Sequence, residues 1–330
     1  MTDILSMNLA ELEGLVTSLG QPAYRAGQIF SWLHQKNAAA FSEMSNLSKV
    51  LREQLEACCH IASAKVVKTL ESKNDTTAKY LLALNDGVKI ESVLMTYSHG
   101  NTACVSTQAG CKMGCSFCAS GADFARDLTA GEMCAQVYAM QKRVNGIVLM
   151  GCGEPLDNFD AVIRFIELIS HPQGLNIGQR HITLSTCGLV PQIQKLAQLK
   201  MQITLAISLH APTDHVRQQF MPVAKRYPLR QLMLACRQYI KATNRRITFE
   251  YALAKGINDD PAQARELIAL LRGINCHVNI IPINKARGDF YPPPRREVQA
   301  FADILQEGRI QTTIRRSLGA DVDAACGQLR

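Results

Sequence analysis

The sequence predicts an α/β protein built on a partial (β/α)6 barrel, which follows a small helical module and a β-hairpin. Three observations lead to this fold class. Apolar residues near the N-terminus recur at three- and four-residue spacing, as in amphipathic helices. Two apolar runs then flank the turn signal Asn85-Asp86-Gly87, and from about residue 102 short apolar strands alternate with helical stretches. Alternation of this kind is typical of a parallel sheet covered by helices.

The N-terminal module is predicted from three segments, LAELEGLVTSLG, AGQIFSWLHQ and SKVLREQLEA, each of which carries an apolar stripe at helical spacing. Gly20 and Pro22 mark the boundary between the first two. We therefore expect residues 1–60 to form a helical accessory domain and residues 61–100 to form a β-hairpin linker.

The main body is expected to span residues 101–310, with a C-terminal strand and tail at 311–330. The expected strands are 103–108, 146–151, 181–186, 202–210, 247–253 and 277–283, with a less regular one at 312–317. Helical patterns lie between them at 161–169, 229–240 and 262–271. Six main repeats favour an open barrel, and a flat doubly wound sheet is the alternative.

The composition argues against two classes of protein, those that span a membrane and those that are secreted. No run of about 18 uncharged apolar residues indicates a membrane span, and the N-terminus lacks the basic and apolar pattern of a secretion signal. We therefore expect a cytoplasmic protein, in which 12 cysteines do not form a disulfide framework. The net charge of +8, with basic clusters at 225–230, 245–246, 285–296 and 315–316, is compatible with a polyanionic partner or with a solvated basic surface.

Three cysteines directly follow the first strand of the main body. Cys111, Cys115 and Cys118 have the spacing C-x3-C-x2-C, and in a β/α barrel chemistry takes place at the C-terminal ends of strands. A four-iron cluster held by three protein ligands keeps one iron open for a substrate. Structural zinc requires four ligands, and Cys152 is the candidate for the fourth.

Polar or glycine-rich residues also follow the later strands. Together they form a ring of candidate cofactor ligands on the same rim as the cysteines. They are Gly153, Glu154, Ser185, Ser208, Leu209, His210 and Asn284.

These motifs resemble those of a known superfamily. C-x3-C-x2-C after the first strand of a partial barrel, with Phe117 before the last cysteine, is similar to the signature of the radical S-adenosylmethionine enzymes. In more detail, CVSTQAGCKMGCSFCAS, MGCGEPLDN, LSTCGLVP, LAISLHAP, NIIPIN and DVDAACGQL resemble the adenine-C2 RNA methyltransferases of the RlmN type. The segment PAYRAGQIFSWLH resembles the helical RNA-binding domain of that family.

The resemblance implies a [4Fe-4S] cluster on the three cysteines and two S-adenosylmethionine molecules per turnover. One molecule methylates Cys326, and the 5′-deoxyadenosyl radical from the other abstracts hydrogen from that methyl group. The carbon radical adds to adenine, and Cys104 resolves the resulting protein–RNA adduct by a transient disulfide with Cys326. Glu91 aligns with the family's proton acceptor.

The resemblance also implies the partners. These are adenine 2503 of 23S ribosomal RNA before full ribosome assembly, adenine 37 of transfer RNA as a second candidate, and a reductant such as flavodoxin or ferredoxin. We expect a monomer. Pro155 favours C2 methylation over the C8 methylation of a related enzyme. Arg25 and Trp32 are expected to contact RNA or pack against the barrel, unless they are a solvated charge and a core residue.

Two hypotheses from other classes remain open at this point. A non-catalytic RNA-binding protein would use the cysteines for structural zinc and would not need S-adenosylmethionine. A radical enzyme acting on a small molecule would leave the basic clusters and the helical module without a use.

Overall fold

The computed structural model describes residues 1–121 and 123–329 and contains a ten-stranded mixed sheet with the order β14-β13-β12-β11-β10-β9-β6-β5-β4-β3. The last predicted residue of the tail, 330, lies outside the described residues. Within this sheet, β6 and the strands from β9 to β14 are parallel, and each lies beside the next strand of the sheet in chain order. They are β6 (Gly100–Cys104), β9 (Gly146–Leu149), β10 (Ile182–Thr186), β11 (Thr204–Ser208), β12 (Ile247–Leu253), β13 (Cys276–Pro282) and β14 (Thr312–Ile314).

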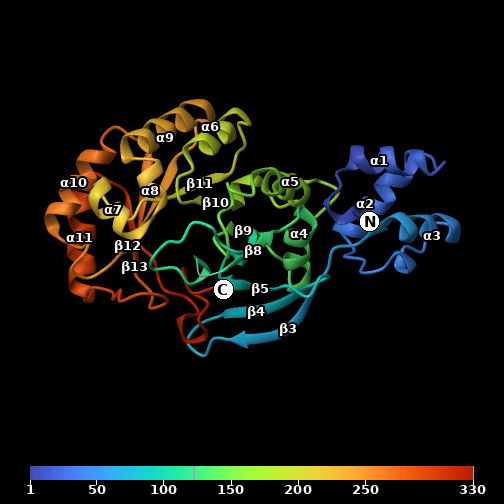
Figure 1. Ribbon diagram of the computed structural model, residues 1–330, viewed down its shortest axis with the longest axis horizontal. Coiled ribbons are helices and arrows are strands. Elements are labelled where there is room, and N and C mark those ends of the chain that lie inside the picture. Colours follow the sequence, from blue (N-terminus) through green and yellow to red (C-terminus); the bar gives the residue numbers. More distant parts are fainter. Residues whose placement is uncertain (122, 330) are drawn as a thin grey trace.

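This strand order identifies the fold as a partial barrel. A doubly wound sheet reverses its strand order at a switch point, whereas here the order never reverses, so the doubly wound alternative is wrong. Right-handed crossovers in one direction place the helices on the same side, and the sheet curls inside their arc (Figure 1). The main helices are α4 (Ala130–Ala139), α5 (Phe159–Ser170), α6 (Val190–Gln198), α9 (Leu229–Thr243), α10 (Pro261–Leu271) and α11 (Arg295–Glu307), with the shorter α7 (Asp214–Phe220) and α8 (Val223–Arg226) beside them.

The first strand of the barrel ends earlier than expected. Instead of one strand over 103–108, β6 ends at Cys104, and a separate strand β7 (Gln108–Gly110) pairs with β8 (Phe124–Asp127). The chain turns between them at Ser106, whose hydroxyl donates to the Glu91 carbonyl at 2.6 Å. This turn lifts the cysteine loop away from the sheet and over the strand ends.

The predicted hairpin is present but belongs to the large sheet. β4 (Thr77–Leu84) and β5 (Lys89–Tyr97) pair antiparallel, β3 (Ala64–Glu71) adds to one side, and β5 pairs with β6 on the other. The sheet therefore runs without interruption from the expected linker into the barrel. β3 was not expected because most of its residues are exposed, which leaves no clear apolar alternation. Helix α4 also lacks a clear pattern, since it is buried on almost every side.

The N-terminal module contains the three expected helices, α1 (Leu9–Ser18), α2 (Arg25–His34) and α3 (Lys49–Cys58), and the short strands β1 (Thr2–Asp3) and β2 (Cys59–His60). Arg25 and Trp32 both donate to Asn46 of the same module, and Trp32 packs against the main core. None of the helices in the described part of the chain is long and apolar enough to cross a membrane.

The module is joined to the barrel by a buried polar contact. His34 of α2 is 1% exposed, and its Nδ1 lies 2.8 Å from the Tyr138 hydroxyl of α4. Desolvation, followed by the charge of His171, lowers the pKa of His34 from 6.5 to about 3. The imidazole is therefore neutral in the folded protein at neutral pH.

His34 should make folding sensitive to acid. Because its pKa is lower in the folded state, its contribution is present above about pH 6.5 and is lost as the pH falls towards 3. Between pH 7 and pH 5 this amounts to about 2 kcal/mol of unfolding free energy. Chemical denaturation at both pH values should show a smaller loss for His34→Gln than for the wild type. The exposed His215→Gln is the control, and equal losses in all three proteins would contradict the assignment.

Candidate active site

A cavity of about 160 Å³ lies at the C-terminal ends of the parallel strands and contains most of the predicted cofactor residues. We call it the strand-end cavity. The predicted residues that line it are Cys111, Cys115, Cys118, Gly153, Glu154, Ser185, Ser208, His210, Asn284 and Cys326. They come from the C-terminal ends of β10 and β11, from the loops after β7, β9, β11 and β13, and from the C-terminal tail, so residues far apart in the sequence meet at one rim.

The cysteine loop presents three thiols to this cavity. Ser116 donates its backbone N–H to the Phe220 carbonyl at 2.9 Å, which fixes the loop against α7. Desolvation raises the pKa of Cys111 to about 12 and raises that of Cys115 as well. The Cys111 and Cys115 thiols are therefore neutral until a metal displaces their protons, so metal binding would release protons here.

The donor set fits a multi-iron cluster better than a single metal ion. Among residues 1–121 and 123–329, no group of three or more His, Cys, Asp or Glu side chains surrounds a common point where one ion could bind. A four-iron cluster instead takes each thiolate at a separate corner. Cys152, the proposed fourth zinc ligand, is 1% exposed and does not line the cavity. Among the described residues, these four cysteines therefore do not form a zinc site.

Glu154 is built into the wall of the cavity. It is 4% exposed, Oε1 accepts from the Leu156 N–H at 3.0 Å, and Oε2 accepts from the Cys187 N–H at 2.7 Å. Burial raises its pKa, while these hydrogen bonds oppose the shift. Gly153 precedes it with φ of +105°, a conformation that L residues rarely adopt. Glu154 thus ties the end of β9 to the end of β10.

The segment after β11 is held by a buried arginine that the sequence analysis did not identify. Arg217 is fully buried, and it donates to the carbonyls of Cys187 at 2.6 Å and Leu209 at 3.2 Å. His210 accepts the Ala252 N–H on Nδ1 at 2.9 Å, and desolvation with the Arg217 charge lowers its pKa to about 3. His210 therefore faces the cavity as a neutral ring. Leu209 is fully buried and does not line the cavity, so it can contribute only through its backbone.

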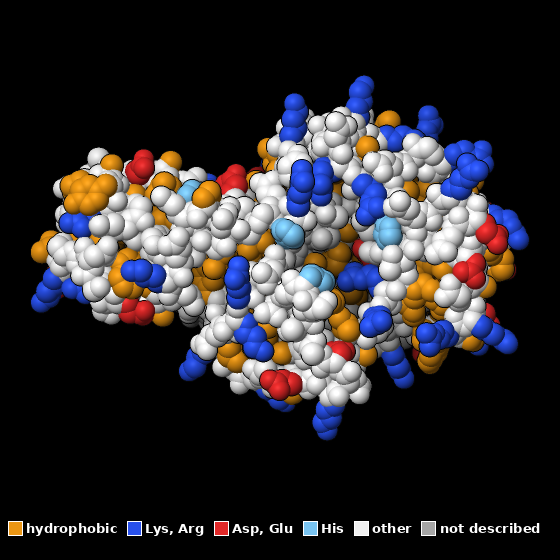
Figure 2. Space-filling model, turned by 180° about the vertical axis from the view of Figure 1, so that it is seen from behind, with side chains coloured by type: hydrophobic (Ala, Val, Ile, Leu, Met, Phe, Trp, Pro, Cys, Tyr) orange, Lys and Arg blue, Asp and Glu red, His pale blue; other side chains and the backbone are white. Residues whose placement is uncertain are grey.

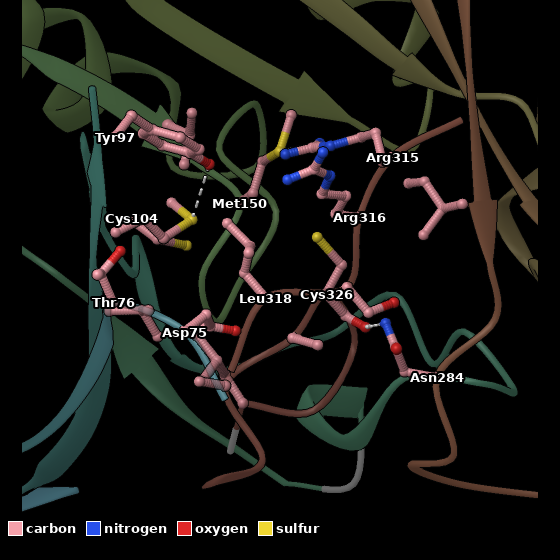
Figure 3. Close-up of a pocket in the computed structure, with 18 of the residues that line it drawn as sticks. Asp75, Thr76, Tyr97, Cys104, Met150, Asn284, Arg315, Arg316, Leu318 and Cys326 are labelled. Carbon is pink, nitrogen blue, oxygen red and sulfur yellow. Dashed lines mark hydrogen bonds between the residues drawn. The ribbon is translucent and has the colours of Figure 1, made fainter. Parts of the chain in front are cut away.

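A second, larger cavity of about 600 Å³ contains both cysteines to which the resemblance assigns covalent chemistry. We call it the two-cysteine cavity. Cys104 and Cys326 point into it, together with Tyr97, Met150 and Arg315 (Figure 3). Cys326 and Asn284 line both cavities. Cys326 therefore lies at the junction between the cysteine loop and the larger cavity.

The two thiols differ in their surroundings. Desolvation and the nearby Cys326 raise the pKa of Cys104 to about 12. Cys326 is exposed to the cavities, yet protein surrounds it on most sides, and desolvation raises its pKa too. The positive charge of Arg315 opposes this rise at Cys326. Both cysteines are free thiols in this structure.

The tail that carries Cys326 is fastened on several sides. The Ala119 N–H donates to the Gly327 carbonyl at 2.8 Å, and the Ser120 hydroxyl donates to the Leu329 carbonyl at 2.6 Å. Asn284 Nδ2 donates to the Cys326 carbonyl at 3.2 Å (Figure 3). The tail is thus bound to the cysteine loop and to the loop after β13.

Glu91 does not enter either cavity. Its carboxylate lies 3.0 Å from the Lys79 ammonium, and both residues line a separate cavity of about 230 Å³. Val93 and Met95 on the same strand do line the two-cysteine cavity. Because alternate residues of a strand share one face, Glu91 belongs to the same row but lies beyond its end.

Comparisons with known proteins agree with this architecture. The radical SAM superfamily model matches residues 105–268, and the N-terminal domain model of ribosomal RNA large subunit methyltransferases matches residues 2–61. A crystal structure of a radical SAM methyltransferase from Sphaerobacter thermophilus covers 100% of this chain and 99% of its own, with 43% identity and a TM-score of 0.95. The protein is thus a radical SAM enzyme, a class that uses a [4Fe-4S] cluster and S-adenosylmethionine.

Curated relatives show to which family within the radical SAM enzymes the chain belongs. A probable dual-specificity RNA methyltransferase RlmN from Alkaliphilus oremlandii is 53% identical over 99% of this chain and 97% of its own length. A protein of the same description from Lachnospira eligens is 49% identical over 100% of this chain and 96% of its own length. The chain belongs to the RlmN family.

Gly153 provides a test of how closely the strand ends pack. A Cβ at this position would lie 2.7 Å from the Gln108 backbone nitrogen, in addition to the strain of positive φ. At Gly256, φ is also positive, at +72°, but nothing lies within 4 Å. We expect Gly256→Ala to cost about 1 kcal/mol of unfolding free energy and Gly153→Ala about 3 kcal/mol, measured by urea denaturation. Equal costs would contradict the close packing.

Proposed function

We propose that the protein methylates C2 of an adenine in RNA through a methylated Cys326 and a covalent protein–RNA adduct. The observation that carries this proposal is the shared position of Cys326, which lines both the strand-end cavity and the two-cysteine cavity. A side chain at this junction can accept a methyl group from one cavity and present it to a base in the other. Adenine C2 is not nucleophilic, so the methyl carrier must be activated before it reacts.

The residues of the strand-end cavity would hold the two cofactors. Cys111, Cys115 and Cys118 would bind the cluster through their thiolates, while Gly153, Glu154, Ser185, Ser208, His210, Asn284 and the Leu209 backbone would bind S-adenosylmethionine. When bound, the cluster supplies the electron that cleaves S-adenosylmethionine reductively. Buried walls keep water away from this step. We infer two S-adenosylmethionine molecules per turnover, because methylation of Cys326 and its activation each consume one.

Cys104 is suited to release the product. It lies in the two-cysteine cavity with Cys326, where burial keeps its thiol neutral until the adduct forms. The Cys104 thiol would lose its proton, and its sulfur would then bond to the Cys326 sulfur. The bond from Cys326 to the methylene carbon would break, with its electron pair passing to the RNA, and the carbon would take up a proton to become the methyl group. We retain Glu91 as the candidate proton acceptor. For this role the adenine of the RNA would have to approach the part of β5 where Glu91 is paired with Lys79.

The substrate we propose is 23S ribosomal RNA at adenine 2503, before the ribosome is fully assembled, with adenine 37 of transfer RNA as a second substrate. The names of the curated relatives support an RNA substrate. Lys and Arg side chains project from the face in Figure 2, with several around a central hollow, and they could bind phosphates. We further propose that the protein acts as a cytoplasmic monomer and receives electrons from a flavodoxin or ferredoxin.

The product identifies the reaction. Anaerobically reconstituted protein, incubated with S-adenosylmethionine, a reductant and 23S ribosomal RNA, should yield 2-methyladenosine in digested RNA analysed by mass spectrometry. Cys326→Ala should yield none, because it removes the methyl acceptor, while cofactor cleavage continues. A product of 8-methyladenosine would instead establish the alternative C8 reaction and show that Pro155 does not determine the position.

Cys104→Ala should separate adduct formation from release. Without the resolving thiol, the RNA should remain attached to Cys326, so a protein–RNA species should persist on denaturing gels. Cys134→Ala, which removes a fully buried thiol of α4 outside both cavities, is the control. Normal turnover by Cys104→Ala would eliminate Cys104 from the mechanism.

A further inference from the structure

A second carboxylate in the strand-end cavity has no place in the chemistry described so far. Glu250 of β12 is 4% exposed and lines this cavity. Its Oε1 accepts a hydrogen bond from Asn279 Nδ2 at 3.0 Å. Its Oε2 is buried and has no hydrogen-bond partner among the residues that the structure describes. The Arg315 guanidinium lies 3.7 Å from Oε2, which is too far for a hydrogen bond.

This oxygen, which accepts no hydrogen bond, lies close to the proposed site of methyl transfer. Glu250 lines the strand-end cavity, Arg315 lines the two-cysteine cavity, and Cys326 lines both. The Glu250–Arg315 ion pair therefore crosses the wall at which Cys326 sits. For its methyl group to reach Cys326, a cofactor in the strand-end cavity must bring its sulfur atom to this same wall.

Glu250 differs in this respect from the other buried groups of the cavity. Each oxygen of Glu154 accepts a backbone N–H, and His210 is a neutral ring. A buried carboxylate oxygen that accepts no hydrogen bond is costly, and the Arg315 guanidinium at 3.7 Å compensates for its charge only in part. A positively charged ligand group in the cavity would compensate for the rest of this charge.

We propose that Glu250 selects the cofactor by charge, because its carboxylate attracts the positively charged sulfonium of S-adenosylmethionine and not the neutral thioether of S-adenosylhomocysteine. This inference rests on the proposed function. Methylation of Cys326 would convert S-adenosylmethionine into S-adenosylhomocysteine inside the cavity. This neutral product must leave before a second S-adenosylmethionine can bind. The Glu250 carboxylate would attract the sulfonium but not the thioether that remains after the methyl group has left. It would therefore favour replacement of S-adenosylhomocysteine by a new S-adenosylmethionine.

The test compares the binding of the two ligands. Dissociation constants for S-adenosylmethionine and S-adenosylhomocysteine are measured on cluster-loaded protein without a reductant, in a Cys326→Ala background that prevents methyl transfer. Glu250→Gln has a similar shape but no charge. We expect it to weaken S-adenosylmethionine binding by about tenfold and S-adenosylhomocysteine binding by less than about threefold. Glu266→Gln, at an exposed position on α10, should change neither value.

The other outcomes are distinct. Equal weakening of both ligands would overturn the proposal, since it would mean that Glu250 contacts a group common to both, such as a ribose hydroxyl. Unchanged binding of both would overturn it as well. If the Cys326→Ala protein with Glu250 intact bound neither ligand, the proposed function itself would fail. Cluster absorbance and thermal unfolding report whether Glu250→Gln folds. If it does not, Glu250→Asp, which keeps the charge, must preserve the preference for S-adenosylmethionine.

Discussion

The hydrogen bonds between the cysteine loop and the C-terminal tail are the contacts on which the site depends. Ala119 and Ser120, directly after Cys118, donate hydrogen bonds to the carbonyls of Gly327 and Leu329. They bring together two segments separated by about two hundred residues of chain, and residues of the tail line both cavities. Because a carbonyl and an N–H impose direction as well as distance, these bonds also fix the orientation of Cys326 between them.

Buried polar groups give the strand ends a similar rigidity. Gln108 is fully buried, accepts the Glu154 N–H at 2.8 Å and donates to Asp127 and Asp157. Arg217 performs the corresponding role for the ends of β10 and β11. Loops whose backbone groups are already hydrogen-bonded lose little conformational entropy when a ligand binds to them. The polar residues beneath the cavity are therefore as much part of the site as those that line it.

Much of this site could be predicted from the sequence, because the chemistry is carried by short motifs at strand ends. The alternation of strands and helices placed Cys111, Ser185 and Asn284 on one rim, and the structure brings them together. Arg217 and Glu250 could not be found from motifs, since an isolated charge gives no sign of its partners. One signal of Glu250 is present in the sequence, because it is the one charged residue in the otherwise mainly apolar strand ITFEYAL. The position of Glu91 beyond the cavities depends on strand register, which the hairpin pattern alone does not fix.

The barrel is incomplete, and this determines what can approach it. The sheet does not close on itself; after β6 it continues outward through β5, β4 and β3, and β14 is left as the opposite edge. The two-cysteine cavity is lined from both parts of the sheet, with Cys104 of β6 on one side and Arg315, directly after β14, on the other (Figure 3). A closed barrel of eight strands admits ligands only at its end, because side chains fill its interior. Here the absent strands leave a lateral slot, so a single nucleotide can enter sideways while the polymer it belongs to stays outside.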